Sequence, residues 1–347
     1  DSLRRCLASR DLYRELWLRP RTLLQPAAAD RAVGHVASAL RVAEWLERFL
    51  ASRRLQLGQT ICYTYWLWTE TVGVGMVRHR HPEMLIVSRA HGFDLYAERW
   101  EPPYIPMQRS ALESADAVFA VSAHGCDYLR TRHPVAADRV HVARLGVRDP
   151  GTVAARSEDG ILRILTCSRI EEVKRLDLAI KGIAEFARQH PDLAVDWTHF
   201  GSGQLRESVR AAAERELPTS VKWSFRGETP NEEVLDHYRR SPVDLLLNVS
   251  WSEGVPVSMM EAQSFGVPVI GTAVGGVPEI VDSENGVLLS PDPAPTEIAS
   301  ALSVFLSNRS MVHALRDRSR ARWESRYSAA PNFRRFVETI QSIGVFR

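Results

Sequence analysis

Lysine is the scarcest charged residue in this sequence of 347 residues. Of its 44 basic residues only three are lysines, and the rest are arginines; the lysines are Lys174, Lys181 and Lys222. This bias follows genome composition, and it makes each lysine mildly informative. The formal net charge is only +2, so charge alone gives no reason to expect nucleic acid as a partner.

Cysteine and long apolar stretches are also scarce. The four cysteines form no Cys-x-x-Cys pair, and they are Cys6, Cys62, Cys126 and Cys167. This spacing argues against a zinc site and a disulfide framework. No stretch reaches the roughly 18 uninterrupted apolar residues of a membrane span. Residues 1–21 are rich in arginine without an apolar centre, unlike a signal peptide. We therefore expect a cytoplasmic protein.

Two motifs that would indicate other chemistry are missing. No Asp-x-Asp sequence occurs in the chain, so we expect no bound metal. No Gly-x-Gly-x-x-Gly follows a strand at the start of either half, which argues against a nicotinamide-dependent dehydrogenase. The residues themselves therefore call for no cofactor.

Apolar runs alternate with helical patterns along most of the chain, as is typical of α/β units with parallel sheets. The length predicts two domains, since single cores rarely exceed about 250–300 residues. A polar stretch with proline and glycine, residues 148–160, predicts the hinge between domains at residues 1–150 and 151–325.

The two halves differ in completeness. The second half predicts a complete doubly wound domain, with strands at 162–167, 194–200, 221–225, 244–249, 268–271 and 286–289. The first half predicts strands at 61–68, 85–88, 117–121 and 139–145. It opens with residues 1–51, which have a helical pattern, whereas a Rossmann domain usually opens with a strand and a glycine-rich turn. Either the first strands are absent from the sequence or this domain is built differently.

The most informative segment, Glu253–Glu261, follows a predicted strand and reads Glu-Gly-Val-Pro-Val-Ser-Met-Met-Glu. Pro256 suits the first position of a helix, which places Glu261 about one turn inside it. Free backbone N–H groups at such a helix start bind phosphates or hydroxyls. Glu253 would lie at the mouth of the sheet, where open α/β folds bind ligands. The alternative is an ordinary capped helix with both glutamates in solvent.

This segment, with the Gly266–Ile270 sequence after it, resembles the donor-site signature of retaining family-4 glycosyltransferases of the GT-B fold, of the bacterial polysaccharide-biosynthesis type. Further matches follow in order at Ser168–Asp177, Phe200–Gly203 and Gly275–Glu279. The resemblance is continuous over about residues 163–306.

The resemblance implies an α/β fold in which two Rossmann-like domains face each other across a cleft. It implies that residues 326–347 form a C-terminal helix packing back toward the first domain. The implied activity is transfer of a sugar from a nucleotide-diphosphate donor to an acceptor hydroxyl of a glycan or lipid-linked glycan. Double displacement would need a carboxylate at the anomeric carbon, which the sequence cannot locate. The resemblance favours front-face attack, with the leaving diphosphate assisting deprotonation.

Four residues are predicted to act at the reacting centre. Arg169 offers a bidentate fork and Lys174 a mobile charge, which together can neutralise a diphosphate without a metal. The alternative for this pair is a solvated loop. The resemblance implies that Glu253 contacts the donor sugar. It also implies that His91, in the segment Ser88–Asp94, faces that sugar.

The remaining expected donor contacts come from the resemblance. Glu261 is expected to hold the ribose hydroxyls. Backbone groups are expected from Gly201, Gly203, Gly254, Val255, Pro256, Val257, Gly275 and Gly276. The last two would let the backbone approach the ligand closely.

Three weaker candidates lie in the first half. Arg89 and Asp94 flank His91 in the same predicted loop, and Asp94 also suits the stabilisation of a turn. Ser122 resembles part of another loop of the first domain but is equally suited to cap a helix.

One departure keeps two other functions open. The family usually has a glycine-rich loop near the start of the first domain. No such loop precedes Ile61, and Gly73 and Gly75 lie in a predicted helix. A catalytically inactive scaffold that binds a nucleotide or a partner is therefore an alternative. A nucleotide-sugar epimerase is another, although it would be expected to bring extra carboxylates and a histidine into the cleft.

Residues Leu12–Arg21 mix aromatic, leucine and arginine side chains. Such a mixture suits the interface of an anionic membrane, so we expect peripheral contact with the inner membrane face. The alternative is an ordinary helix packed on the first domain, and Pro20 limits any amphipathic helix to a short one.

Overall fold

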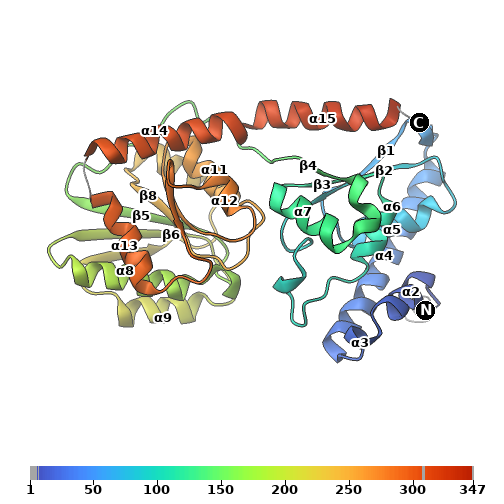
Figure 1. Cartoon of the computed structure of the whole chain (residues 1–347), viewed down its shortest axis with the longest axis horizontal. Helices are drawn as coiled ribbons and strands as arrows, with labels where there is room; N and C mark the ends of the chain where they lie inside the picture. Colours follow the sequence, from blue (N-terminus) through green and yellow to red (C-terminus); the bar gives the residue numbers. More distant parts are fainter. Residues whose placement is uncertain (1–5, 7, 307–308, 346–347) are drawn as a thin grey trace. The chain divides into compact units, whose positions relative to one another are not determined.

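The computed structural model describes residues 6, 8–306 and 309–345. The chain forms two compact units: unit 1 comprises Asp1–Ala143 with Arg334–Arg347, and unit 2 comprises Arg144–Phe333. The predicted divisions follow residues 150 and 325, whereas the units divide after residues 143 and 333. Both units are built on parallel sheets (Figure 1).

Unit 1 contains a four-stranded sheet in the order β1-β2-β3-β4, which is also the order in the sequence. Its strands are β1 (Ile61–Thr64), β2 (Leu85–Ala90), β3 (Ala117–Ala120) and β4 (Val140–Val142). Its α-helices are α2 (Arg10–Leu18), α3 (Pro20–Leu23), α4 (Pro26–Ser52), α5 (Thr69–Arg78), α6 (Gln108–Ser114) and α7 (Ala123–Arg132). The predicted strand over 61–68 ends at Thr64, because residues 65–68 turn instead.

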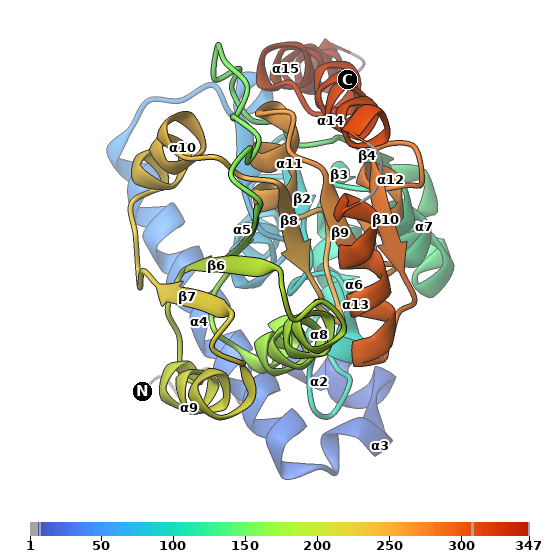
Figure 2. The same cartoon turned by 90° about the vertical axis from the view of Figure 1, so that its left-hand side faces the viewer.

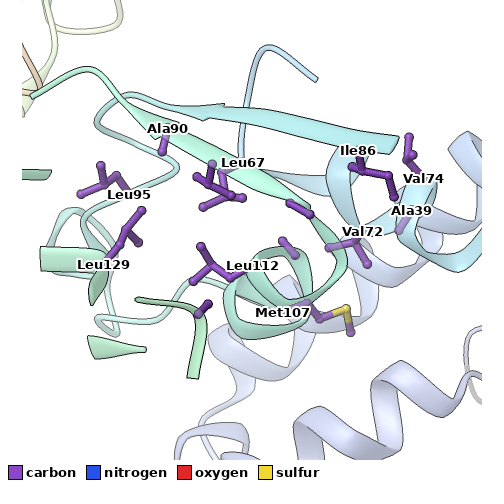
Figure 3. Packing of buried hydrophobic residues seen from close by; sticks show 14 of the residues in the cluster. Ala39, Leu67, Val72, Val74, Ile86, Ala90, Leu95, Met107, Leu112 and Leu129 are labelled. Atoms are coloured by element: carbon purple, nitrogen blue, oxygen red, sulfur yellow. The ribbon is translucent and has the colours of Figure 1, made fainter. Parts of the chain in front are cut away.

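The two glycines of α5 have a packing role. A Cβ atom on Gly73 would lie 2.6 Å from the Ala39 carbonyl oxygen of α4, and one on Gly75 would lie 2.6 Å from the Ser114 Cβ atom of α6. These glycines therefore let α5 pack closely on both helices. Figure 3 shows the core around this contact, where Val72, Ile86 and Leu112 are buried.

The C-terminal helix α15 (Ala329–Val345) contributes its later residues to unit 1. The ring centroid of Phe336 lies 5.1 Å from that of Phe119 on β3 and 5.8 Å from that of Tyr63 on β1. The guanidinium carbon of Arg89 lies 4.2 Å from the centroid of the same ring. This helix thus covers one side of the unit 1 sheet.

Unit 2 contains a six-stranded parallel sheet in the order β10-β9-β8-β5-β6-β7. Its strands are β5 (Ile161–Cys167), β6 (Ala194–Phe200), β7 (Val221–Phe225), β8 (Leu245–Asn248), β9 (Val269–Thr272) and β10 (Gly286–Leu289). The order reverses between β5 and β8, as in a doubly wound Rossmann sheet. The predicted complete domain is therefore present.

Helices cover both faces of this sheet (Figure 2). One face carries α8 (Leu176–Gln189), α9 (Arg206–Glu216) and α13 (Pro295–Ser303). The other carries α10 (Asn231–Arg240), α11 (Val257–Ser264) and α14 (Arg309–Arg326), while α12 (Val277–Ile280) is a single turn after β9. In α8 the apolar residues Ile180, Ile183 and Phe186 recur at helical spacing and are buried against the sheet. Among the described residues, no helix is long and apolar enough to span a bilayer.

Candidate active site

The candidate site lies in unit 2, at the carboxyl ends of β5 and β8. Strand order reverses between these two strands, so the loops that follow them diverge to opposite faces of the sheet. Open α/β folds bind ligands in the crevice that this divergence creates. A small cavity at this point is lined in part by Thr166, Ser168, Lys174, Asn248 and Ser258.

Lys174 and Glu253 meet across this crevice. The Lys174 Nζ atom lies 2.6 Å from Glu253 Oε1, and both side chains are largely buried. The Asn248 Nδ2 atom donates a longer bond of 3.4 Å to the same carboxylate oxygen. The structure therefore brings together two residues that lie 79 positions apart in the sequence. At this position the ammonium can bind an anionic group of a ligand, and the adjacent carboxylate can accept a hydrogen bond from a ligand hydroxyl.

Arg169 lies apart from this pair. Its side chain is 75% exposed and its Nη2 atom forms an ion pair of 2.9 Å with Glu171. It follows β5 closely, as predicted, but it does not share the buried site of Lys174. The alternative of a solvated loop therefore fits Arg169, whereas it does not fit the largely buried Lys174.

Glu261 is buried on α11, with an exposed fraction of 7%. Asn231, at the start of α10, donates a hydrogen bond of 2.8 Å from Nδ2 to Glu261 Oε1. Burial raises the pKa of Glu261 above its ordinary value, and the bond from Asn231 opposes this shift. The alternative interpretation, in which Glu261 lies in solvent, is therefore wrong. A carboxylate held by one oxygen can offer the other to a ligand hydroxyl.

Gly201 and Gly203 bring two loops into backbone contact. A Cβ atom on Gly201 would lie 1.9 Å from the Ser168 carbonyl oxygen, and one on Gly203 would lie 2.3 Å from the Ile170 carbonyl oxygen. Gly201 also has a positive φ of 126°. No other residue type fits here without moving the loop that precedes Lys174.

The segment Gly254–Val257 and the glycine pair Gly275–Gly276 also meet. The Gly276 amide donates a hydrogen bond of 2.8 Å to the Gly254 carbonyl oxygen, and Gly275 has a φ of 53°. Val255 is buried, whereas Val257 is 45% exposed. One detail of the prediction is wrong: Pro256 caps the helix, with ψ at 128°, and Val257 is the first helical residue.

In unit 1, His91 lies directly after β2. Its ring centroid lies 4.6 Å from that of Tyr65 and 4.3 Å from that of Trp66. Neither ring nitrogen has a hydrogen-bond partner within the described part of the chain, and Nδ1 lies 3.7 Å from Asp94 Oδ2. The histidine therefore keeps its hydrogen-bonding capacity for another group.

The weaker candidates of unit 1 have structural roles. The Asp94 carboxylate accepts hydrogen bonds from the backbone amides of Leu67, His91 and Gly92, which supports the turn interpretation. Arg89 is buried and donates from Nη2 to the Ala143 carbonyl oxygen at 2.7 Å. Ser122 caps α7 by accepting a bond of 2.9 Å from the Gly125 amide.

Three residues of the site were not predicted. Asn248 contacts Glu253, Asn231 contacts Glu261, and Arg175 bonds to the loop after β8. Only Arg175, directly after Lys174, has a sequence position that draws attention to it. Across the described residues no group of three His, Cys, Asp or Glu side chains could hold a metal ion. Independence from metal remains a prediction.

The fold of unit 2 is that of a Rossmann-type domain, and comparison with known proteins gives the family whose model it matches. Residues 162–308 match the family described as glycosyl transferases group 1. The chain therefore contains a group 1 glycosyltransferase domain.

Two curated relatives agree with this assignment. The amylovoran biosynthesis glycosyltransferase AmsK of Erwinia amylovora is 26% identical over 215 residues, or 60% of this chain and 52% of that protein. A D-inositol 3-phosphate glycosyltransferase of Segniliparus rotundus is 32% identical over 193 residues, 52% of this chain and 42% of that protein. The chain thus spans about half the length of the curated relatives that it matches.

The structural likeness extends further along the chain. A crystal structure of a TarM variant from S. aureus, in complex with fondaparinux, α-GlcNAc-glycerol and UDP, matches with a TM-score of 0.69 at 15% identity. The match covers 87% of this chain and 58% of that one. At this identity the match shows the fold alone, and the fold class is that of the GT-B enzymes.

Proposed function

We propose that this protein transfers a sugar from a nucleotide-diphosphate donor to an acceptor hydroxyl, with retention of anomeric configuration and without a metal. The single observation that carries the proposal is the pair Lys174–Glu253, joined at 2.6 Å across the point where the strand order of unit 2 reverses. Glu261, buried on the helix that follows, supplies a second carboxylate.

Each charged group has a distinct task in this proposal. The Lys174 ammonium, assisted by Arg169, stabilises the negative charge that develops on the leaving diphosphate. Glu253 accepts hydrogen bonds from the donor sugar, and Glu261 accepts them from the ribose hydroxyls. His91 of unit 1 contacts the donor sugar in this proposal. Attack occurs on the face from which the diphosphate leaves.

The names of similar proteins support a carbohydrate or polyol acceptor. TarM was crystallised with UDP and sugar ligands, and two curated relatives are named for amylovoran biosynthesis and D-inositol 3-phosphate. For this chain we propose a glycan, free or lipid-linked, as the acceptor.

Thermal-shift measurements with UDP, GDP and ADP test donor binding, because a ligand that binds only the folded state raises its Tm. A panel of sugars on the nucleotide that binds, assayed with and without EDTA, then tests transfer. We expect activity to survive EDTA. A strict requirement for Mn²⁺ or Mg²⁺ would contradict the proposed charge partners.

Two other functions give different outcomes in the same assays. A non-catalytic scaffold would bind a nucleotide but release no product from any nucleotide-sugar. An epimerase would convert the donor without an acceptor. Lys174 beside Glu253 favours transfer over both, because a cation at the diphosphate assists the departure of a leaving group.

We propose in addition that the segment Leu12–Arg21 contacts an anionic membrane. The short helix α2 exposes three apolar side chains and buries an acidic one: Trp17 is 81% exposed, and the Glu15 carboxylate accepts a hydrogen bond from the Tyr104 hydroxyl. The other two exposed apolar side chains are Tyr13 and Leu16. An outward aromatic face with arginines beside it suits a lipid headgroup region.

Co-sedimentation with anionic vesicles at low and high salt tests this contact. Replacing Arg19 and Arg21 should weaken binding at low salt, by about 1 kcal/mol for each basic residue near the surface. Trp17→Ser should also weaken it, whereas Trp45→Ser, at a 58% exposed position of α4, is the matched control. Protein that stays in the supernatant at low salt would exclude the membrane contact.

A further inference from the structure

Arg175 has an unusual backbone conformation for its residue type. Its φ is 47° and its ψ is 44°, in the left-handed region that glycine adopts freely. Among the described residues, Met107 is the only other non-glycine residue with a positive φ. A side chain with a Cβ atom persists in this conformation only where its surroundings hold it there.

Contacts of the Arg175 guanidinium stabilise this backbone conformation. Nε donates to the Val249 carbonyl oxygen at 2.6 Å, and Nη2 donates to the carbonyl oxygens of Ser250 at 3.3 Å and Pro291 at 3.0 Å. Nη1 forms an ion pair of 3.0 Å with Asp292. The arginine side chain is 15% exposed, whereas the Asp292 side chain is 96% exposed. The bonds to the Val249 and Ser250 carbonyl oxygens are the more sheltered part of this contact.

Three consecutive residues tie the loop after β5 to the loop after β8. The Val173 carbonyl oxygen accepts a bond of 3.0 Å from the Trp251 amide, Lys174 pairs with Glu253, and Arg175 holds Val249 and Ser250. A diphosphate oxygen at Lys174 Nζ would compete with Glu253 for the same ammonium protons. The Val173 and Arg175 links do not use those protons, so they can hold the loops during that exchange.

We infer that Arg175 is a positioning residue, which fixes the distance between Lys174 and Glu253 while the donor occupies the crevice. The inference rests on the proposed function, because it assigns those two residues to the donor. Arg175 itself contacts neither the donor nor the acceptor in this account. Its left-handed backbone turns the guanidinium toward the carboxyl end of β8.

The test compares Arg175→Gly with Arg175→Lys and with the control Asp292→Asn. Glycine adopts the observed φ without strain, so Arg175→Gly should fold and lose only the guanidinium. Its kcat should fall by ~10²-fold, the scale for a misplaced catalytic group, while the donor KM changes by only a few fold. Added methylguanidine should restore part of the activity. Arg175→Lys should lie between glycine and wild type, and Asp292→Asn should resemble wild type.

The measurements separate this inference from the proposed function. Calorimetry with UDP, GDP and ADP on the wild-type protein comes first, and binding of none of them contradicts the proposed function. If a nucleotide binds and sugar is transferred, but kcat of Arg175→Gly stays within twofold of wild type, the inference is wrong. It is also wrong if activity falls only in proportion to the unfolded fraction and methylguanidine restores nothing.

Discussion

The two units share parallel sheets but differ in strand order. Unit 2 reverses its order between β5 and β8, whereas the described sheet of unit 1 runs from β1 to β4 without a reversal. A reversal separates the loops on either side of it, and in unit 2 that gap holds Lys174 and Glu253. At the end of β2 in unit 1, by contrast, His91 lies among the rings of Tyr65 and Trp66. The comparison favours unit 2 as the site of the proposed charged donor.

The largest expected effect is on Lys174. Lys174→Ala should lower kcat/KM by ~10²-fold or more, because it removes the buried charge that faces the developing diphosphate. Arg169→Ala should have a smaller effect, about tenfold, because Arg169 is largely exposed and pairs with Glu171. Lys222→Ala, at an exposed position on β7, is the control and should leave kcat/KM unchanged. If kcat/KM stays within threefold of wild type for both Lys174→Ala and Arg169→Ala, neither side chain stabilises the charge on the leaving diphosphate.

Glu261 should control nucleotide affinity in unit 2. Glu261→Ala should weaken binding of the free nucleotide by about 2 kcal/mol, the range for hydrogen bonds to a charged group. Calorimetry on wild type and variant measures this difference. Equal affinities would show that the ribose is held elsewhere.

The pH dependence of this affinity follows from the burial of Glu261. Its pKa is raised, and the ionised form is the one that accepts hydrogen bonds from ribose. Affinity should therefore be full above the raised pKa and fall as the pH drops through it. Glu261→Gln cannot titrate at this position and should lose this part of the pH dependence.

His91 offers the corresponding test for unit 1. His91→Ala should lower kcat by about tenfold, the scale of one lost hydrogen bond in the transition state, without changing nucleotide affinity. Ser122→Ala, which removes only a helix cap in the same unit, is the control for local destabilisation. A loss of nucleotide affinity in His91→Ala would contradict the division of tasks between the units.

The smallest expected effect is on acid stability. Burial lowers the pKa of His35 to about 3 and that of His133 to about 4 in unit 1, and that of His199 to about 4 in unit 2. One further histidine with a lowered pKa lies in each unit, His141 in unit 1 and His237 in unit 2. A lowered pKa means that stability is complete above the ordinary value of about 6.5 and is lost as the pH falls toward the lowered value.

Unit 1 has one more such histidine, so the histidines should cost it more stability than they cost unit 2 at pH 5.5. Hydrogen exchange at pH 7.5 and 5.5, corrected for the intrinsic exchange rate and resolved by peptide, measures both units in one sample. Equal losses in the two units would contradict this difference.

The strand bounds predicted from the sequence are more accurate for unit 2 than for unit 1. The bounds of β6, β7 and β10 are as predicted, because regular alternation of apolar strands and amphipathic helices marks both ends of each element. β1 ends earlier than predicted, because an apolar aromatic run continues into the turn at residues 65–68. An apolar run alone does not distinguish a strand from a loop whose rings pack together.

At the site, the residues carrying charge were predictable and their partners were not. Lys174, Glu253 and Glu261 lie in recognisable segments. Asn231 contacts Glu261 from 30 residues away, and no local pattern indicates that contact. The left-handed conformation of Arg175 is set by carbonyl oxygens more than 70 residues further along the chain. Such long-range contacts depend on tertiary packing and leave no local signal in the sequence.

Hydrogen exchange of the full chain, with and without the nucleotide that binds best among UDP, GDP and ADP, tests the central claim most directly. We predict new protection in unit 2, at residues 168–176 and 249–262, and none at residues 65–68 of unit 1. The absence of binding by all three nucleotides, or protection confined to unit 1, would contradict the assignment of the donor to unit 2.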